Sequence, residues 1–330
     1  MSCIRLSLRR FSDFDAIEEE WNRLLEHCWA NNPCAVLSWQ RAWWNEFGQG
    51  KEQLLLGYDS GGVLKGIAPL VRQGRTVTFS GGRDLCDYMD FLVCRGEEGR
   101  FYRSFVEFMA DEQWGRMELY SIPQDSPTLE HLPAIAREAG YVVELSKEDA
   151  APGVHLPGSW DEYLASLSKK DRHELRRKLR RLRKAGDVHV LSLGSPEEVE
   201  GGIDQFFLLL RESRGEKARF LNPQRERFFR TVAGAAAKAE ALKLFFLEIN
   251  DTTVAAAMCF DYHGTRFLYN SGFDRNYGYY SVGLLLKALC IKDAIEQGLE
   301  YFDFMRGAEA YKYQLEGNDR WIYQMVVTRK

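Results

Sequence analysis

The spacing of hydrophobic residues along the chain predicts helices and strands in an order that occurs twice. Apolar residues between 17 and 28 recur at helical spacing, and three apolar stretches at 53–59, 63–72 and 75–82 have the length and composition of strands. Only a few residues separate these strands, and strands joined by such short turns cannot be parallel neighbours. We therefore expect an antiparallel meander in the first half of the chain.

The second half repeats this order. A long helix over 160–185 leads to further helices and then to three strands at 242–249, 253–264 and 265–273. Another apolar helix, a strand and a closing strand complete the half. A doubly wound nucleotide-binding fold is disfavoured, because its neighbouring strands would have to be parallel.

A loosely polar segment over 146–153 separates the two halves. We therefore expect an α/β protein of the mixed α+β kind, with two similar domains at 1–152 and 153–330.

Composition and charge restrict the location and the partners of the protein. The 330 residues are 45% hydrophobic and 28% charged with a net charge of −4, which is typical of a globular protein and argues against one that coats nucleic acid. The seven cysteines are scattered without a CxxC pair, and no segment reaches the roughly 18 apolar residues of a membrane span. We expect a cytoplasmic protein without a membrane span. The six histidines lack the spacing of a zinc site, so we expect no metal.

The start of the helix over 282–297 has the features of an anion site. The first N–H groups of a helix have no partner within it, and here Ser281 offers a capping hydroxyl while Gly283 has no side chain. Such amides can approach a diphosphate closely. The alternative is an ordinary serine-capped helix whose leucines only fill a core.

The elements around this helix resemble the unit with which GNAT-type acyltransferases hold the pyrophosphate of coenzyme A. A strand ending in SGFD precedes the turn, and another strand follows the apolar helix. The segment 280–283 stands where the family has Arg/Gln-x-x-Gly-x-Gly/Ala, so the second glycine is missing. The resemblance implies that acetyl-CoA or another acyl-CoA is the cofactor. Its expected contacts are Phe273, Tyr280, Ser281, Val282, Gly283 and Leu284.

The corresponding helix start in the first half carries Glu97 and Glu98, whose charges would repel a diphosphate. We therefore expect 1–152 to be a degenerate GNAT-like domain and 153–330 to hold the acyl donor.

Nearly the whole chain resembles the CelD-type family of tandem GNAT-like proteins, which is linked with bacterial cellulose and other exopolysaccharide systems. The similar segments are WDEYLASLSKKDRHELRRKLRRLRKAG, DFMRGAEAYKYQL, GIAPLV and DYMDFLV. The resemblance implies an acyltransferase, by preference an acetyltransferase, that acts on an amine or hydroxyl of a saccharide or cell-envelope precursor. The family is also similar to FemAB-type peptidyltransferases, so an aminoacyl-tRNA dependent transferase is one alternative. A non-catalytic binding protein of an exopolysaccharide system is the other.

Direct acyl transfer needs a base for the acceptor proton and donors for the developing negative charge. The strand before the anion site is expected to offer a backbone N–H to the carbonyl oxygen. Asp303 and Glu309 are the candidate bases, and Tyr311 or Tyr313 is a candidate to protonate the leaving thiolate, although alternating aromatic residues also pack. The segment AYKYQ resembles the FemAB-type segment in which a lysine neutralises charge in the transition state, which implies that role for Lys312.

A basic helix is the remaining candidate for function. Ten lysine or arginine residues lie between Lys169 and Lys184, around an apolar stripe of leucines. The charged face is either merely solvated or binds a phosphorylated partner, such as a nucleotide sugar, a lipid-linked saccharide, a tRNA or an anionic membrane. No heptad zipper follows the helix, which argues against DNA. The expected substrate contacts are Lys169, Arg172, Arg176, Arg219 and Arg306.

Overall fold

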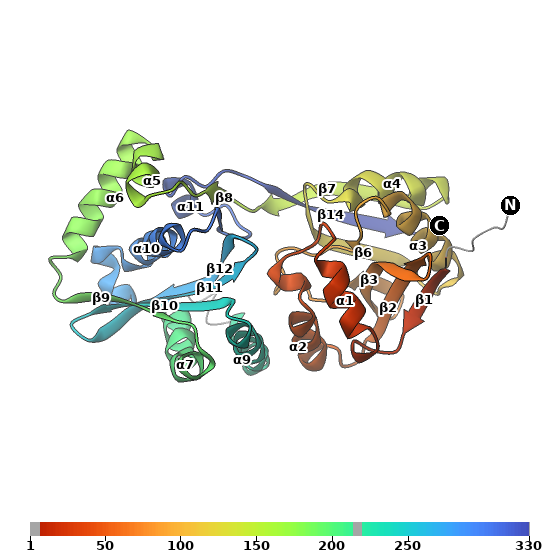
Figure 1. Cartoon of the computed structure of the whole chain (residues 1–330), viewed down its shortest axis with the longest axis horizontal. Helices are drawn as coiled ribbons and strands as arrows, with labels where there is room; N and C mark the ends of the chain where they lie inside the picture. Colours follow the sequence, from red (N-terminus) through yellow and green to blue (C-terminus); the bar gives the residue numbers. More distant parts are fainter. Residues whose placement is uncertain (1–6, 214–219, 330) are drawn as a thin grey trace. The chain divides into compact units, whose positions relative to one another are not determined.

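The computed structural model describes residues 7–213 and 220–329. Two compact units divide the chain, Met1–Asp149 with Trp321–Lys330 and Ala150–Arg320, and each is built on one sheet (Figure 1). Arg219, an expected substrate contact, lies outside the described residues.

The first unit contains an eight-stranded sheet in the order β1-β2-β3-β4-β6-β14-β7, with β5 paired to β3. Its strands are β1 (Ser7–Phe11), β2 (Glu52–Ser60), β3 (Val63–Gln73), β4 (Thr76–Phe79), β5 (Leu92–Val93), β6 (Arg116–Pro123), β7 (Val142–Ala150) and β14 (Trp321–Thr328). Its α-helices are α1 (Glu18–Leu25), α2 (Leu37–Phe47), α3 (Glu98–Asp111) and α4 (Pro127–Glu138). The antiparallel pairs β2–β3 and β3–β4 confirm the expected meander.

The last strand differs from the expected domain boundary. We expected it to close the second domain, but β14 pairs antiparallel with β6 and therefore belongs to the first unit. Ile322, Met325 and Val327 are buried in this sheet. An amphipathic strand pattern shows that a strand has an apolar face but does not show which sheet it joins. The first unit thus consists of two chain segments rather than of 1–152 alone.

The second unit contains a six-stranded sheet in the order β8-β13-β12-β11-β10-β9. Its strands are β8 (Gly153–His155), β9 (Val188–Leu193), β10 (Leu242–Ile249), β11 (Thr252–Tyr262), β12 (Thr265–Phe273) and β13 (Tyr301–Asp303). Its α-helices are α5 (Trp160–Ser166), α6 (Lys169–Leu182), α7 (Pro196–Ser213), α9 (Pro223–Lys238), α10 (Val282–Glu296) and α11 (Ala310–Gln314). The helices α6 and α10 lie on one side of this sheet and α7 and α9 on the other (Figure 1). The expected meander β10-β11-β12 is confirmed.

The helix expected over 160–185 is two helices. The first ends at Ser166, and the second begins at Lys169 after Ser168, whose hydroxyl accepts a hydrogen bond from the N–H of Asp171 at 3.1 Å. In a continuous helix this amide would donate to a backbone carbonyl of the preceding turn. The Ser168 hydroxyl takes the place of that carbonyl, so one helix ends and another begins here. In the described parts of the chain, no helix is long and apolar enough to cross a membrane.

Candidate active site

A cavity of about 370 Å³ lies within the second unit, at the N-terminal end of α10. Ser271 and Phe273 line it from β12, and Ser281, Gly283 and Leu284 line it from the start of α10. Further lining residues come from α6, α7 and α11. The cavity therefore lies where the sequence predicted an anion site.

The cavity opens because two parallel strands pair over only part of their length. β12 pairs with β13 from Thr265 to Phe267, but β12 continues to Phe273 while β13 ends at Asp303. On its other edge, β12 pairs with β11, where a bulge leaves Tyr269 without an opposite residue. Bulges redirect the backbone of a strand and often lie beside active sites. The second half of β12 thus has one edge that β13 does not cover.

The turn before α10 holds Ser281 in an unusual conformation. The 3₁₀ helix η3 (Arg275–Tyr280) begins after Asp274, and Ser281 then has a φ of 58°, in the left-handed region. We expected the Ser281 hydroxyl to cap the helix, but it makes no capping bond and instead accepts a hydrogen bond from Nη2 of Arg181 at 3.2 Å. The expected cap was therefore wrong, since the left-handed backbone turns the hydroxyl away from the first amides.

Two amides at this helix start have no acceptor in the part of the chain that the structure describes. The N–H groups of Leu284 and Leu285 both donate to the carbonyl oxygen of Ser281, at 3.1 and 3.0 Å. Within residues 7–213 and 220–329, no hydrogen bond is found for the N–H groups of Val282 and Gly283. Unpaired amides at the positive end of a helix dipole favour an anion.

Gly283 is required for the approach of the helix to β12. A Cβ atom at this position would lie 2.7 Å from Cδ1 of Phe273, well inside van der Waals contact. Both residues line the cavity. The missing side chain therefore brings the amides of the first turn beside the uncovered edge of β12.

Cations of α6 flank this helix start. Lys178 lines the cavity, and the guanidinium of Arg181 lies 4.6 Å from the centre of the Tyr279 ring. The Nε of Arg181 is buried and has no partner among the described residues. Arg177 bonds to Glu174, and this bond lowers the pKa of Glu174 to about 2, so that acid stays ionised. The side of α6 that faces the cavity keeps an excess of positive charge.

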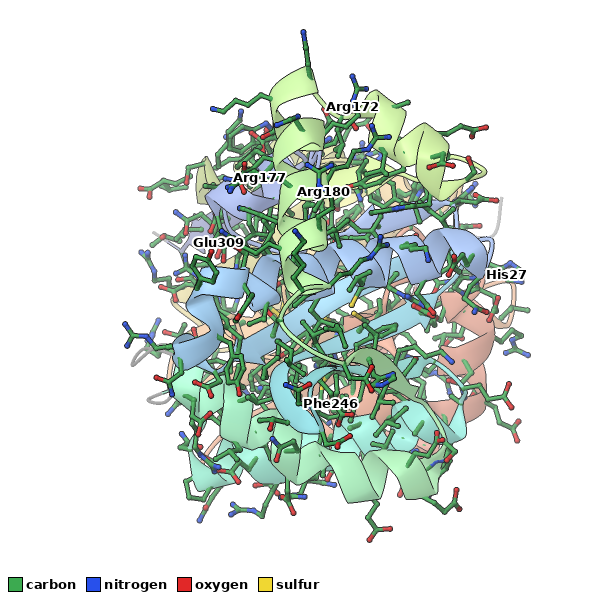
Figure 2. All side chains as sticks on the ribbon, turned by 90° about the vertical axis from the view of Figure 1, so that its left-hand side faces the viewer. His27, Arg172, Arg177, Arg180, Phe246 and Glu309 are labelled. Atoms are coloured by element: carbon green, nitrogen blue, oxygen red, sulfur yellow. The ribbon has the colours of Figure 1, made fainter. Side chains whose placement is uncertain are left out.

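The substrate contacts expected on α6 lie elsewhere on the helix. Lys169 and Arg176 are exposed, and Nη1 of Arg172 donates to the carbonyl of Ala165 at 2.9 Å. None of the three lines the cavity. Figure 2 shows Arg172 on the opposite side of α6 from Arg177, on whose side Glu309 also lies. Neighbouring charges on one helix point in different directions, so a run of cations does not form one site.

Lys312 does not face the cavity with a free ammonium. Its Nζ donates to the carbonyl oxygens of Met305, Arg306 and Gly307, each at 2.8 Å, and lies 2.9 Å from a carboxylate oxygen of Glu309. An ammonium has three hydrogens, and all are taken. We expected this lysine to neutralise charge in the transition state, but its bonds instead fix the loop after β13. The backbone of Arg306 takes part in this loop, and its side chain does not line the cavity.

The two candidate bases differ in position. Asp303 is 1% exposed, accepts a hydrogen bond from the N–H of Met305 at 2.7 Å, and lies outside the cavity lining. Glu309 lines the cavity, and its side chain is 52% exposed. Of the two, only Glu309 can meet a substrate without rearrangement.

The two candidate tyrosines also differ. Tyr311 lines the cavity, with its ring 6.3 Å from that of Phe304. Tyr313 is exposed and donates to Asp319 at 2.8 Å, away from the cavity. The expected contacts Tyr280 and Leu284 are half-buried and pack against the core of this unit.

Lys287 is a cavity residue that the sequence reasoning missed. It lies on α10, is 7% exposed and lines the cavity. Its Nζ donates to the carbonyl oxygen of Gly283 at 2.9 Å and lies 4.6 Å from the centre of the Tyr311 ring. The signal was a single charge among the first ten, otherwise apolar, residues of the helix.

The corresponding helix start in the first unit is occupied by acids, as expected. The helix α3 begins at Glu98, one carboxylate oxygen of Glu98 accepts from the N–H of Gly96 at 2.8 Å, and the other accepts from the indole of Trp29 at 3.1 Å. Negative charge at this helix start disfavours a further anion. Across the described residues of both units, no group of three or more His, Cys, Asp or Glu side chains could hold a metal ion.

Comparison with known sequences gives a partial match. Residues 169–313 match the family model of the acetyltransferase (GNAT) domain, which is less than half of the chain. A search of curated protein sequences found no match.

Solved structures resemble the chain over its whole length. FemX superposes with a TM-score of 0.66 at 12% identity, covering 97% of both chains. The C-terminal domain of a putative lysylphosphatidylglycerol synthetase from Agrobacterium fabrum gives 0.60 at 13% identity, covering 94% of this chain and 92% of that one. A tandem GNAT protein from the clavulanic acid biosynthesis pathway gives 0.54 at 13% identity, covering 99% of both. These likenesses concern the fold alone, and they confirm the expected mixed α/β architecture with two tandem GNAT-like domains. The resemblance to CelD-type proteins stays a prediction.

Proposed function

We propose that the protein is an acyl-coenzyme A dependent acyltransferase, by preference an acetyltransferase. It would transfer the acyl group directly to an amine or hydroxyl of a saccharide or cell-envelope precursor. The observation that carries the proposal is the start of α10, where the amides of Val282 and Gly283 have no acceptor among the described residues and Gly283 lines a cavity beside the uncovered edge of β12. The match of residues 169–313 to an acetyltransferase domain supports the same chemistry.

Electrostatics at this helix start favours a diphosphate. The amides of Val282 and Gly283 lie at the positive end of the α10 dipole, and Lys178 and Arg181 add positive charge nearby. Hydrogen bonds to a charged group are stronger than those to a neutral one. A doubly charged carrier would gain more binding free energy here than a neutral one.

The reaction needs no covalent enzyme intermediate. The acceptor nitrogen or oxygen attacks the thioester carbonyl carbon, the carbonyl electrons move to oxygen, and the carbon–sulfur bond breaks as the carbonyl re-forms. Glu309 is our candidate to take the acceptor proton, because it lines the cavity and carries a negative charge that Lys312 stabilises. Tyr311 is our candidate to give a proton to the departing thiolate. The uncovered edge of β12 would offer backbone N–H groups to the carbonyl oxygen.

Isothermal titration calorimetry with acetyl-CoA tests the proposal. We expect binding with a dissociation constant in the range of about 1 μM to 1 mM that is typical of enzyme substrates. Gly283→Ala places a methyl group 2.7 Å from the Phe273 ring and should weaken binding at least about tenfold. Gly234→Ala in α9 is the matched control, since its added Cβ meets nothing within 4 Å. Absence of binding at millimolar acetyl-CoA, by calorimetry and by thermal shift, would count against the proposal.

An aminoacyl-tRNA dependent transferase is the second candidate, and the exposed face of α6 favours it. Lys169, Arg176 and Arg180 are exposed on this helix and do not line the cavity, so they are accessible to a large anionic partner. This reading predicts tRNA binding whose affinity falls steeply with salt. Joint replacement of Arg176 and Arg180 by Ala should abolish it, whereas the same change at Lys238 and Lys292 should not. Salt-independent or absent tRNA binding would exclude this candidate.

A further inference from the structure

The buried ammonium of Lys287 lies beside the first turn of α10. Its Nζ is 2.9 Å from the carbonyl oxygen of Gly283, four residues earlier on the same helix, so the side chain points back towards the helix N-terminus. The residue is 7% exposed and lines the cavity. The charge is therefore held close to the two amides of Val282 and Gly283 that have no acceptor among the described residues.

Contacts on two sides hold this charge in place. The bond to the Gly283 carbonyl fixes one hydrogen of the ammonium, and the Tyr311 ring lies 4.6 Å away on the α11 side of the cavity. An aromatic face attracts a cation, by about 2 kcal/mol or more when the pair is desolvated. A charge fixed in this way needs no reorganisation to meet an anion.

The other charges that border the cavity do not make Lys287 redundant. Lys178 approaches from α6 and lies 3.7 Å from a carboxylate oxygen of Glu174, which takes part of its charge. Glu309 is the acid of the cavity lining and is paired with Lys312 at 2.9 Å. Lys287 is thus the cation closest in the chain to the helix start, and the most deeply buried of those that line the cavity.

We propose that Lys287 is a ligand of the donor's diphosphate and makes the site selective for a diphosphate-bearing carrier. The inference rests on the proposed function. The amides of Val282 and Gly283 can each give one hydrogen bond, which suits one phosphate group, and the ammonium supplies a charge-assisted bond to the other. The segment 280–283 lacks a second glycine, and the lysine compensates by charge for the close backbone approach that this glycine would allow.

Calorimetry with three related ligands measures this selectivity. Wild-type protein is titrated with coenzyme A, which carries the diphosphate, with 4′-phosphopantetheine, which carries one phosphate, and with inorganic pyrophosphate. Lys287→Met should weaken coenzyme A and pyrophosphate by about ten- to hundredfold, as expected for the loss of one charge-assisted bond. The monophosphate should lose less than about threefold, and the affinity for coenzyme A should depend less on salt than in the wild type.

Matched variants separate the role in binding from a role in folding. Lys287→Arg keeps the charge and should keep coenzyme A affinity within about fivefold. Lys292→Met removes a partly exposed lysine of the same helix, outside the cavity, and should behave as wild type. If Lys287→Met does not fold, protection of Lys287 from reductive methylation by coenzyme A in the wild type, read by mass spectrometry, is the second measurement.

The outcomes distinguish the two proposals. If the wild type binds neither coenzyme A nor pyrophosphate, the proposed function fails and this inference with it. If the wild type binds coenzyme A but Lys287→Met binds it equally well with the same salt dependence, or the ligand leaves Lys287 unprotected, the role of Lys287 alone is overturned. If all three ligands weaken equally in Lys287→Met, the lysine is structural and the proposed selectivity is also overturned.

Discussion

Replacement of Lys312 by Met should destabilise the second unit rather than act on chemistry alone. Lys312 is 1% exposed, and its ammonium bonds the carbonyl oxygens of three successive residues, 305–307, each at 2.8 Å. Within this loop Met305 has a φ of 62° and Gly307 a φ of 110°. A non-glycine residue in the left-handed region is strained and persists only where its surroundings hold it. The lysine holds the three carbonyl groups of this loop.

The expected loss can be worked from the acceptors left behind. A buried acceptor that loses its partner costs about 1–3 kcal/mol. Met305 is buried, whereas Arg306 and Gly307 are half-buried, so their carbonyls can turn to water. One full penalty and two smaller ones give a loss of about 3 kcal/mol in the free energy of unfolding.

Urea unfolding followed by circular dichroism measures this loss. The control is Lys292→Met on the surface of α10, which should change the free energy of unfolding by less than about 0.5 kcal/mol. The reasoning would be refuted if Lys312→Met were as stable as the wild type but lost its transferase activity. That result would restore the transition-state role that we expected for Lys312.

Two further predictions concern buried charges of the two units. Burial raises the pKa of Asp90 to about 6, although Ser126 and Thr128 donate hydrogen bonds to its carboxylate. When the pKa of an acid is higher in the folded than in the unfolded protein, the protein is more stable below the ordinary pKa of that acid and loses stability as the pH rises. The free energy of unfolding should therefore fall by about 2 kcal/mol between pH 4 and pH 6.5, and Asp90→Asn should remove this slope in urea titrations at several pH values; an unchanged slope in the variant would assign it to other groups. Arg266 is fully buried and makes two 2.7 Å bonds to Asp261 and one 2.6 Å bond to Asp293. Arg266→Met leaves these acids unpaired and should lower the free energy of unfolding by about 3–5 kcal/mol. The melting temperature should fall, and an unchanged melting temperature would contradict this prediction.

Features that depend on local periodicity could be predicted from the sequence. The two meanders and the start of the helix at Val282 follow from alternating or helical spacing within short windows. The sheet that β14 joins could not be predicted, because its partner β6 lies about 200 residues earlier in the chain. The break at Ser168 was visible as a possible cap, but the leucine stripe continues across it and favoured one helix.

The candidate site was found in position but only partly in its residues. On α6, Leu175 and Leu182 are buried, so Lys178, three residues after the first and four before the second, faces inwards, while Arg176 faces solvent. That assignment could have been made from the leucine stripe. The contacts of Lys312 and Lys287 could not be predicted, because a sequence shows that a residue is a lysine but not which acceptors its ammonium meets in the fold.

The central claim is that the first amides of α10 bind the charged carrier group, and the nuclear magnetic resonance of these amides tests it most directly. Protein labelled with ¹⁵N-valine and ¹⁵N-glycine is titrated with coenzyme A, with the resonances of Val282 and Gly283 identified by single replacements. We predict that both resonances shift with the dissociation constant measured by calorimetry, while that of Gly234 in α9 stays in place. Binding of coenzyme A without a shift of either helix-start resonance would contradict the account.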